Sequence, residues 1–421
     1  MRWTVLTALC ALLPACVVPC PDEPLARPSE PPAFVVRLHD RLTPPEPGVP
    51  GVDRILPPIG AGEYALHALY AADGRPIAER WLDTVTVWEG ATGVVDAASV
   101  LPARMRPGAL TLLLADGPRA RVRFETSSGL LLGQRDTWGA TPAAGGELVA
   151  QIDLGDGTVL LSRRRTDASP AGVLWIDADE RDGEPRDVFA LDGLSSGRVT
   201  PGRGAPAGVG RAILTVGLED EPAAGAVALI TPGDDDLSRF ELPGVSGCVD
   251  AAPLAPAGDV ARVAVLCVGD PSSAARDGAG LVLLEAAPAL PPRVAVTRAQ
   301  AELFVDHPPT GALVALAGSW VAYLSAGDEE RADALIAVDL TSDAGAILWE
   351  EDRSERWGGA LGEGDFSPGT GELWWPSVEE GVLRFQQVGE GADARFDVLA
   401  AAPPPGCTNL PARQARHLPA P

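Results

Sequence analysis

The chain has 421 residues, of which 47 are glycine and 41 are proline. These residues cost roughly 1 and 3 kcal/mol respectively inside a helix, so the composition excludes a protein built of long helices. The formal net charge of −25 repels nucleic-acid phosphates, and we expect no nucleic-acid partner. Hydrophobic residues make up 46% of the chain, which is enough for a large folded core.

Residues 1–15 have the features of a secretory signal peptide. Arg2 supplies one positive charge, residues 4–13 form a short apolar run, and Ala15 is a small residue at the expected cleavage site. The apolar run is far shorter than the ~20 residues that a membrane-spanning helix needs. The sequence therefore predicts export without a spanning segment.

The segment Leu13-Pro14-Ala15-Cys16 resembles the lipobox of bacterial lipoproteins, in which a leucine and a small residue precede the modified cysteine. The resemblance implies that Cys16 carries acyl chains that anchor the protein to a membrane. Val17, where a retained lipoprotein has aspartate, favours the outer membrane of a Gram-negative cell. The alternative is ordinary signal cleavage that leaves Cys16 unmodified.

Residues 16–61 are rich in proline and in acidic or polar residues, as in Pro44-Pro45-Glu46-Pro47. Such a composition predicts a semi-rigid, extended tether. Within it, Phe34–Leu38 is the one segment with the character of a strand. We therefore divide the chain into a signal peptide (1–15), a lipidated cysteine with its tether (16–61) and a folded domain (62–421).

Four cysteines remain outside the signal peptide and the lipobox: Cys20, Cys248, Cys267 and Cys407. An exported protein meets an oxidising space, so an even number predicts disulfides, and four cysteines allow three pairings. We favour Cys248–Cys267, because the two are nearly equidistant from the expected turn at Pro256-Ala257-Gly258. The remaining pair, Cys20–Cys407, would join the two ends of the chain. No spacing typical of a metal site occurs, and we expect neither a metal nor a cofactor.

A turn that ends in glycine and leads into a short apolar strand recurs along the chain. Two examples are Pro107-Gly108 before Ala109–Leu114, and Asp156-Gly157 before Thr158–Leu161. Successive copies are 46 to 60 residues apart, and their glycines are Gly62, Gly108, Gly157, Gly208, Gly258, Gly311 and Gly371. A fixed period of this length indicates a repeat architecture.

Further strands are expected within each unit. Second strands are predicted at 84–88, 173–176, 227–230, 281–284, 335–338 and 382–385, and third strands at 188–191, 239–242, 293–296, 347–349 and 396–399. A weaker fourth strand precedes the next glycine. Three to four strands per unit of about 50 residues is the arrangement of a propeller blade.

Phe366–Trp374 resembles the turn that opens the blades of WD40-like and TolB-like propellers, although it lacks their aspartate. The resemblance is to an architecture and implies an all-β fold, a β-propeller of antiparallel strands over 62–421. Seven repeat units predict seven blades of three to four strands, with six or eight as alternatives. A β-sandwich, or two separate β domains, is the competing architecture.

Residues that carry chemistry are sparse, and we nominate none as catalytic. The histidines lack metal-ligand spacing: His39, His67, His307 and His417. Asp177–Glu184 resembles a calcium loop, but its acidic residues are out of step by one position, which favours a charged turn. One ring of Trp374-Trp375 could stack on a sugar or a quinone, although we expect packing between blades.

Two functions follow from these observations. We favour a non-catalytic binding or scaffold lipoprotein, held to a membrane, whose partner is an unidentified protein or saccharide. The alternative is a propeller hydrolase or quinoprotein that acts on a saccharide or small molecule. That alternative requires acidic residues of several inner strands to converge, with perturbed pKa values, on the mouth of the channel.

Overall fold

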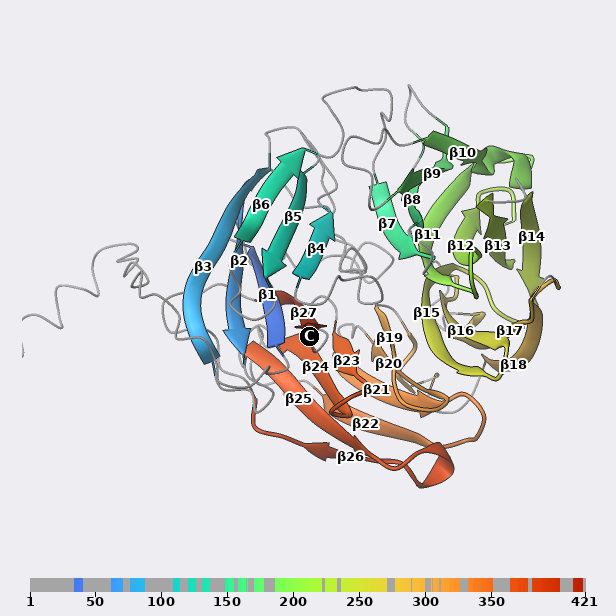
Figure 1. Ribbon diagram of the computed structural model, residues 1–421. Helices are drawn as coiled ribbons and strands as arrows, with labels where there is room; N and C mark the ends of the chain where they lie inside the picture. The colour runs from blue at the N-terminus through green and yellow to red at the C-terminus, as the bar shows by residue number, and fades with distance from the viewer. Residues whose placement is uncertain are drawn as a thin grey trace, which may run out of the picture.

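Figure 1 shows the computed structural model of the chain. The structure describes residues 34–40, 62–70, 76–87, 109–113, 120–125, 131–136, 148–154, 158–163, 165, 170–177, 186–221, 224–232, 236–270, 277–288, 290–299, 304, 306–309, 312–325, 332–350, 364–377, 381–401 and 412–418. For strands β1–β6 and β27 only the backbone is described. The signal peptide, the lipobox and most of the predicted tether lie outside these residues.

The fold is all-β, and the described strands form seven antiparallel sheets, six of four strands and one of three. In spatial order they are β27 (Ala412–Leu418), β1 (Phe34–Asp40), β2 (Gly62–Tyr70) and β3 (Pro76–Val87); β4 (Ala109–Leu113), β5 (Ala120–Glu125) and β6 (Leu131–Asp136); β7 (Leu148–Asp153), β8 (Thr158–Arg163), β9 (Gly172–Asp177) and β10 (Arg186–Ala190); β11 (Val199–Pro206), β12 (Ala212–Leu218), β13 (Gly225–Thr231) and β14 (Asp236–Leu242); β15 (Cys248–Ala257), β16 (Val260–Val268), β17 (Ala279–Ala286) and β18 (Arg293–Ala299); β19 (Leu313–Ala315), β20 (Trp320–Ser325), β21 (Ala334–Asp339) and β22 (Gly345–Glu350); and β23 (Asp365–Ser367), β24 (Glu372–Ser377), β25 (Gly381–Val388) and β26 (Arg395–Val398). Two short 3-10 helices are η6 (Leu191–Leu194) and η8 (Gly391–Asp393).

The sheets are arranged around a common axis (Figure 1). Their first strands lie against one another in succession, from β7 through β11, β15, β19 and β23 to β27. The C-terminal strand β27 pairs with β1, so the last strand of the chain belongs to the same sheet as the first. This arrangement is a β-propeller and confirms the predicted fold class. The blade count of seven stays a prediction, because segments between the sheets lie outside the described residues.

The core lies between neighbouring sheets. Strands β12, β13, β16, β17, β20 and β21 are buried along nearly their whole length. A strand covered on both faces needs apolar side chains at successive positions, which explains the continuous apolar runs in the sequence. Trp374 and Trp375 are both buried; Trp375 packs with Trp320 and Phe385 against the next sheet, and Trp374 lies under Arg384. The expectation that this pair packs between sheets is confirmed.

The recurring glycine marks the turn between the first and second strands of a sheet. Gly258 and Gly371 occupy these turns with φ of +63° and +71°, a conformation that glycine adopts without strain. In the next-to-last unit the sequence pointed to Gly311, but the turn between β19 and β20 holds Gly318, with φ of +74°. The predicted strand there is the innermost strand β19, and β20 was not predicted.

The strand-like segment Phe34–Leu38 forms most of β1, which lies between β27 and β2. The first sheet thus includes a strand from the range assigned to the tether. In the described part of the chain, no helix has the length and apolarity to cross a membrane.

Candidate functional site at the loop end of the β11–β14 sheet

Antiparallel strands give each sheet two distinct ends. At one, which we call the turn end, the first strand turns into the second and the third into the fourth, as at 207–211 between β11 and β12. At the opposite, loop end, the second strand connects to the third and the chain enters from the previous sheet. The loop end of the β11–β14 sheet comprises residues 191–198 and 219–224.

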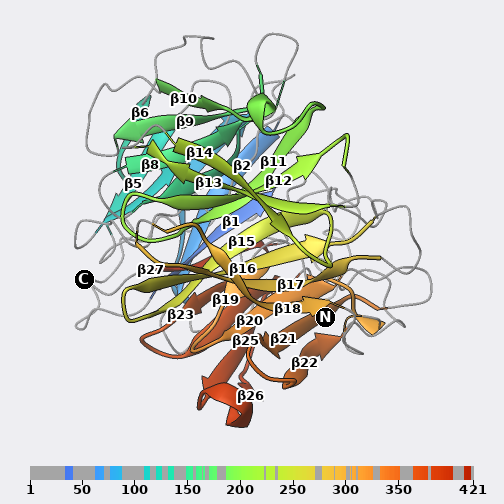
Figure 2. The same ribbon diagram turned by 90° about the vertical axis from the view of Figure 1, so that its right-hand side faces the viewer.

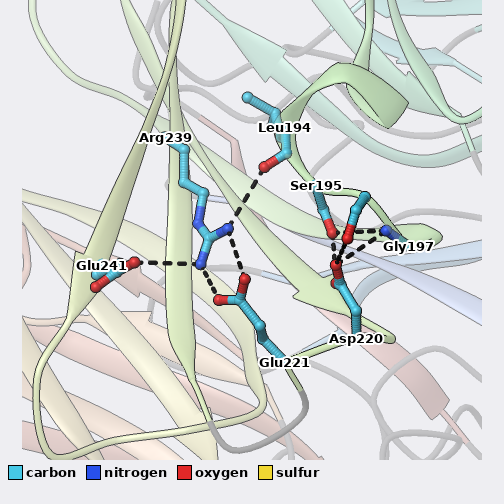
Figure 3. Close-up of polar contacts among 8 residues, drawn as sticks. Leu194, Ser195, Gly197, Asp220, Glu221, Arg239 and Glu241 are labelled. Atoms are coloured by element: carbon cyan, nitrogen blue, oxygen red, sulfur yellow. Dashed lines mark hydrogen bonds and ion pairs between the residues drawn. The ribbon is translucent and has the colours of Figure 1, made fainter.

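Three donors of the entering loop converge on the carboxylate of Asp220 (Figure 3). The Ser195 hydroxyl donates to Oδ1, while the Ser196 hydroxyl and the Gly197 amide donate to Oδ2 at 2.6 and 3.0 Å. Asp220 follows β12, so one side chain joins the loop entering the sheet to the loop between β12 and β13. These contacts fix both loops relative to each other.

The same donors set the charge of Asp220. The hydrogen bond from Ser195, followed by that from Ser196, lowers the pKa of Asp220 from its ordinary 3.8 to about 2. The carboxylate is therefore ionised throughout the physiological range and is a weak base. A general base works best with a pKa near the operating pH, so this geometry suits a fixed negative charge better than proton transfer.

Arg239 extends the cluster across the sheet. Its guanidinium pairs with Glu221, with Glu241 at 3.3 Å, and reaches the carbonyl of Leu194 at 3.5 Å (Figure 3). The Glu221 carboxylate, as acceptor and as charge, raises the pKa of Arg239. Both carboxylates are exposed, so these pairs contribute modestly to stability and mainly hold the acidic loop in place.

The next sheet uses a similar device. Ser246, in the loop that enters the β15–β18 sheet, donates its hydroxyl to the carbonyl of Asp277 at 3.1 Å and its amide to the carbonyl of Gly278 at 2.9 Å. The entering loop is again joined to the loop between the second and third strands. A serine at this position therefore orders the loop end in two successive sheets.

A second polar cluster joins three innermost strands near the ring axis. Asp250 of β15 lies 3.6 Å from the guanidinium of Arg203 on β11, and both side chains are buried. The same carboxylate accepts the backbone amides of Leu313 at 2.9 Å and Ala251 at 2.8 Å. Because these partners belong to β11, β15 and β19, Asp250 fastens three successive sheets together.

The predicted disulfide Cys248–Cys267 is present, joining directly opposed residues of β15 and β16. The hairpin turn lies at Gly258-Asp259, slightly later than expected, and two shifts of register bring the cysteines opposite each other. Cys16, Cys20 and Cys407 lie outside the described residues, so lipidation and the second disulfide stay predictions.

The remaining nominated residues do not gather into one site. His39, His67 and His417 lie on β1, β2 and β27. The carbonyl of half-buried His307 accepts a hydrogen bond from Tyr323, whose burial raises its pKa. Asp177 ends β9, and the rest of the calcium-like segment lies outside the described residues. Among those that are described, no three His, Cys, Asp or Glu side chains could share a metal ion.

Sequence reasoning missed Ser195, Asp220, Arg203 and Asp250. The acidic triplet 219–221 and the pair Ser195-Ser196 are visible in the sequence, but the two segments are far apart along the chain. Only the position of both at one end of one sheet brings them together. Asp250 is surrounded by apolar residues in the sequence, where an isolated charge indicates a buried partner of unknown identity.

No protein-family model and no curated protein matches this sequence. Among solved structures, a candidate 6-phosphogluconolactonase from Bacteroides fragilis has a TM-score of 0.50 at 10% identity, covering 94% of this chain and 100% of that one. The propeller domain of the trilobed protease from Pyrococcus furiosus has a TM-score of 0.39 at 8% identity, covering 70% and 81%. A prolyl endopeptidase has 0.43 at 13%, covering 85% of this chain and 48% of its own. At such identities the likeness concerns the fold alone.

Proposed function

We propose that this chain is an exported lipoprotein, anchored to the outer membrane through Cys16, whose propeller binds a partner protein without catalysing a reaction. The observation that carries the binding role is the Asp220 cluster. It holds an exposed acidic segment, Glu219–Glu221, in a fixed conformation at the loop end. A rigid, charged surface lowers the entropy lost on association and selects a partner of complementary charge.

The overall charge of −25 points to the same kind of partner. An acidic surface attracts a basic one and speeds their encounter, and this attraction weakens as salt rises. We therefore propose a protein with a basic patch as the ligand. A saccharide ligand is the competing outcome, and its binding would depend little on ionic strength.

Photocrosslinking in the native membrane tests the binding role. A benzoylphenylalanine in place of Glu219 should yield one major protein adduct, and the same probe in place of Val398, on the outermost strand β26, should yield little. Raising the salt from about 0.05 to 0.5 M should reduce the adduct, because screening acts on exposed charges. Equal labelling at both positions would contradict binding at the loop end. Turnover of a saccharide panel by the purified protein would instead support the hydrolase.

Mass spectrometry tests the anchor. The N-terminal peptide of the membrane-extracted protein should begin at Cys16 and carry the mass of acyl chains, since stable anchoring takes two or more. Cys16→Ser should release the protein from the membrane fraction. An unmodified N-terminus at Cys16 would remove the anchor and leave the binding role to be judged by crosslinking.

A further inference from the structure

The direction of β1 shows where the predicted tether leaves the propeller. Phe34, the first residue of β1, pairs with Leu418 at the end of β27, and Asp40 pairs with Tyr64 near the start of β2. Strand β27 follows the outermost strand β26, as each innermost strand follows the outermost strand of the sheet before it. It therefore starts at the loop end and finishes, beside Phe34, at the turn end. The chain that leads back to Cys16 thus leaves from the turn end.

Contacts between neighbouring sheets show that their turn ends coincide. Arg211, in the turn after β11, donates to the carbonyls of Ala287 and Leu290 in the turn after β17, at 2.8 and 2.6 Å. Gln387, at the end of β25, binds both the amide and the carbonyl of Ala317 in the turn after β19. In Figure 2 the strands of successive sheets lie side by side across the view. The turn end is therefore one continuous face of the molecule.

This face carries exposed apolar side chains. Val209, in the turn after β11, is 87% exposed, and Leu290, on the neighbouring turn bridged by Arg211, is 59% exposed. Val388, at the turn end of β25, is also exposed. The acidic segment Glu219–Glu221 lies at the opposite end. The turn end thus presents apolar groups where the loop end presents carboxylates.

The length of the tether favours the turn end as the membrane side. Phe34 is the eighteenth residue after Cys16, and a flexible chain of that length has a mean span of about 23 Å. A seven-residue strand is itself about 23 Å long, which sets the height of the ring. To bring the loop end to the bilayer, the tether would have to stretch past that full height. With the turn end facing the bilayer, it needs no extension.

We propose that the turn end rests on the lipid surface, with Val209 and Leu290 in the headgroup region, so that the acidic loop end faces away from the membrane toward the partner. This orientation rests on the proposed lipid anchor. Single valine and leucine side chains bind a bilayer weakly, so the acyl chains hold the protein and these side chains set its orientation. Anionic lipids would repel the Glu219–Glu221 segment and favour the same orientation.

Photocrosslinking to lipid tests the orientation with the full-length, acylated protein in vesicles of phosphatidylethanolamine and phosphatidylglycerol. Benzoylphenylalanine in place of Val209 should form lipid adducts about fivefold more often than the same probe in place of Glu219. A probe in place of Val398, an exposed valine away from the turn end, is the matched control for an apolar position.

Flotation separates the two proposals. The acylated protein should float with the vesicles, and Cys16→Ser should not. Equal lipid labelling at 209, 219 and 398 on floating protein would overturn the orientation and leave the anchor intact. Failure of the acylated protein to float, or flotation of Cys16→Ser, would overturn the anchor and the orientation with it.

Discussion

Asp220 shows how an exposed residue can organise a surface without being buried. Its carboxylate accepts two hydroxyls and one amide, all from residues 195–197 of the loop that enters the sheet. Such short local donors favour the ionised form, and the depressed pKa of Asp220 reports how well they are placed. The physical role of the residue is therefore to order two loops.

Asp220→Asn should loosen these loops, since an amide accepts fewer hydrogen bonds and carries no charge. Hydrogen exchange at the Gly197 amide should quicken severalfold at pH 7, whereas Glu219→Gln, a change of the neighbouring exposed carboxylate, should leave it unchanged. Unchanged exchange in Asp220→Asn would contradict the ordering role.

The same substitution predicts a pH dependence. The folded-state pKa of Asp220 is about 2 and its ordinary value is 3.8, so its contribution to stability is present above the ordinary value and is lost as pH falls through the folded value. The melting temperatures of the wild type and Asp220→Asn should therefore converge between about pH 4 and pH 2. A difference that stays constant over that range would show that Asp220 acts in another way.

Asp250 is the buried counterpart of Asp220. Removing one member of a buried ion pair leaves the other uncompensated, and Asp250→Ala should cost about 3–5 kcal/mol of unfolding free energy. The double variant Asp250→Ala/Arg203→Met should recover part of this loss, because the remaining charge is gone. Urea unfolding measures both. A double variant no more stable than the single one would show that the backbone amides of Leu313 and Ala251 matter more than the pair.

At the scale of single elements, the turn glycines differ in what they require of the backbone. A Cβ at Gly258 or at Gly369 would meet no atom within 4 Å, but only Gly258 has a positive φ, of +63°. Gly258→Ala should therefore destabilise the protein by about 1 kcal/mol through backbone strain alone. Gly369→Ala is the matched control and should be neutral or slightly stabilising in thermal unfolding. Equal losses would indicate that φ is not the cause.

The sequence predicted most strands for a clear physical reason. Residues 227–230 and 281–284 are continuous apolar runs bounded by turns, and they form the centres of β13 and β17. The disulfide Cys248–Cys267 was also predictable, because a hairpin sets which residues face each other. The extra residues that shift its register were not, since they depend on packing against the neighbouring sheets.

The polar clusters could not be predicted from the sequence. Ser195 and Asp220 are brought together by the order of strands in the ring, which no local pattern encodes. In the fifth glycine-marked interval, Gly311 and Gly318 both follow short apolar or proline-rich stretches, and only the strand pairing distinguishes them. Sequence periodicity thus gives the number and kind of elements, while topology decides which side chains meet.

At the scale of the whole molecule, neighbouring sheets are held together by polar clamps as well as by apolar contacts. Gln387 binds the backbone of Ala317 through both atoms of its amide, and the indole of Trp320 donates to the carbonyl of Gly391 at 2.9 Å. These contacts link the last two four-stranded sheets before the chain returns to the first. Stability is therefore distributed around the ring, and it depends on the ring being closed.

Strand β27 closes that ring, because it pairs with β1 of the first sheet and packs against β23 and β24 of the preceding one. Ending the chain before Ala412 removes the strand, leaves the edge of β1 unpaired and uncovers the flank of the last sheet. The melting temperature should fall by about 10 °C or more, consistent with a loss of several kcal/mol, and the exposed edge should promote association. Ending the chain after Leu418 removes residues beyond the strand and should change neither property. Calorimetry with size-exclusion chromatography distinguishes these results. A shortened chain that melts like the full one would mean that the ring is held by its other contacts, and that β27 is an addition to the first sheet.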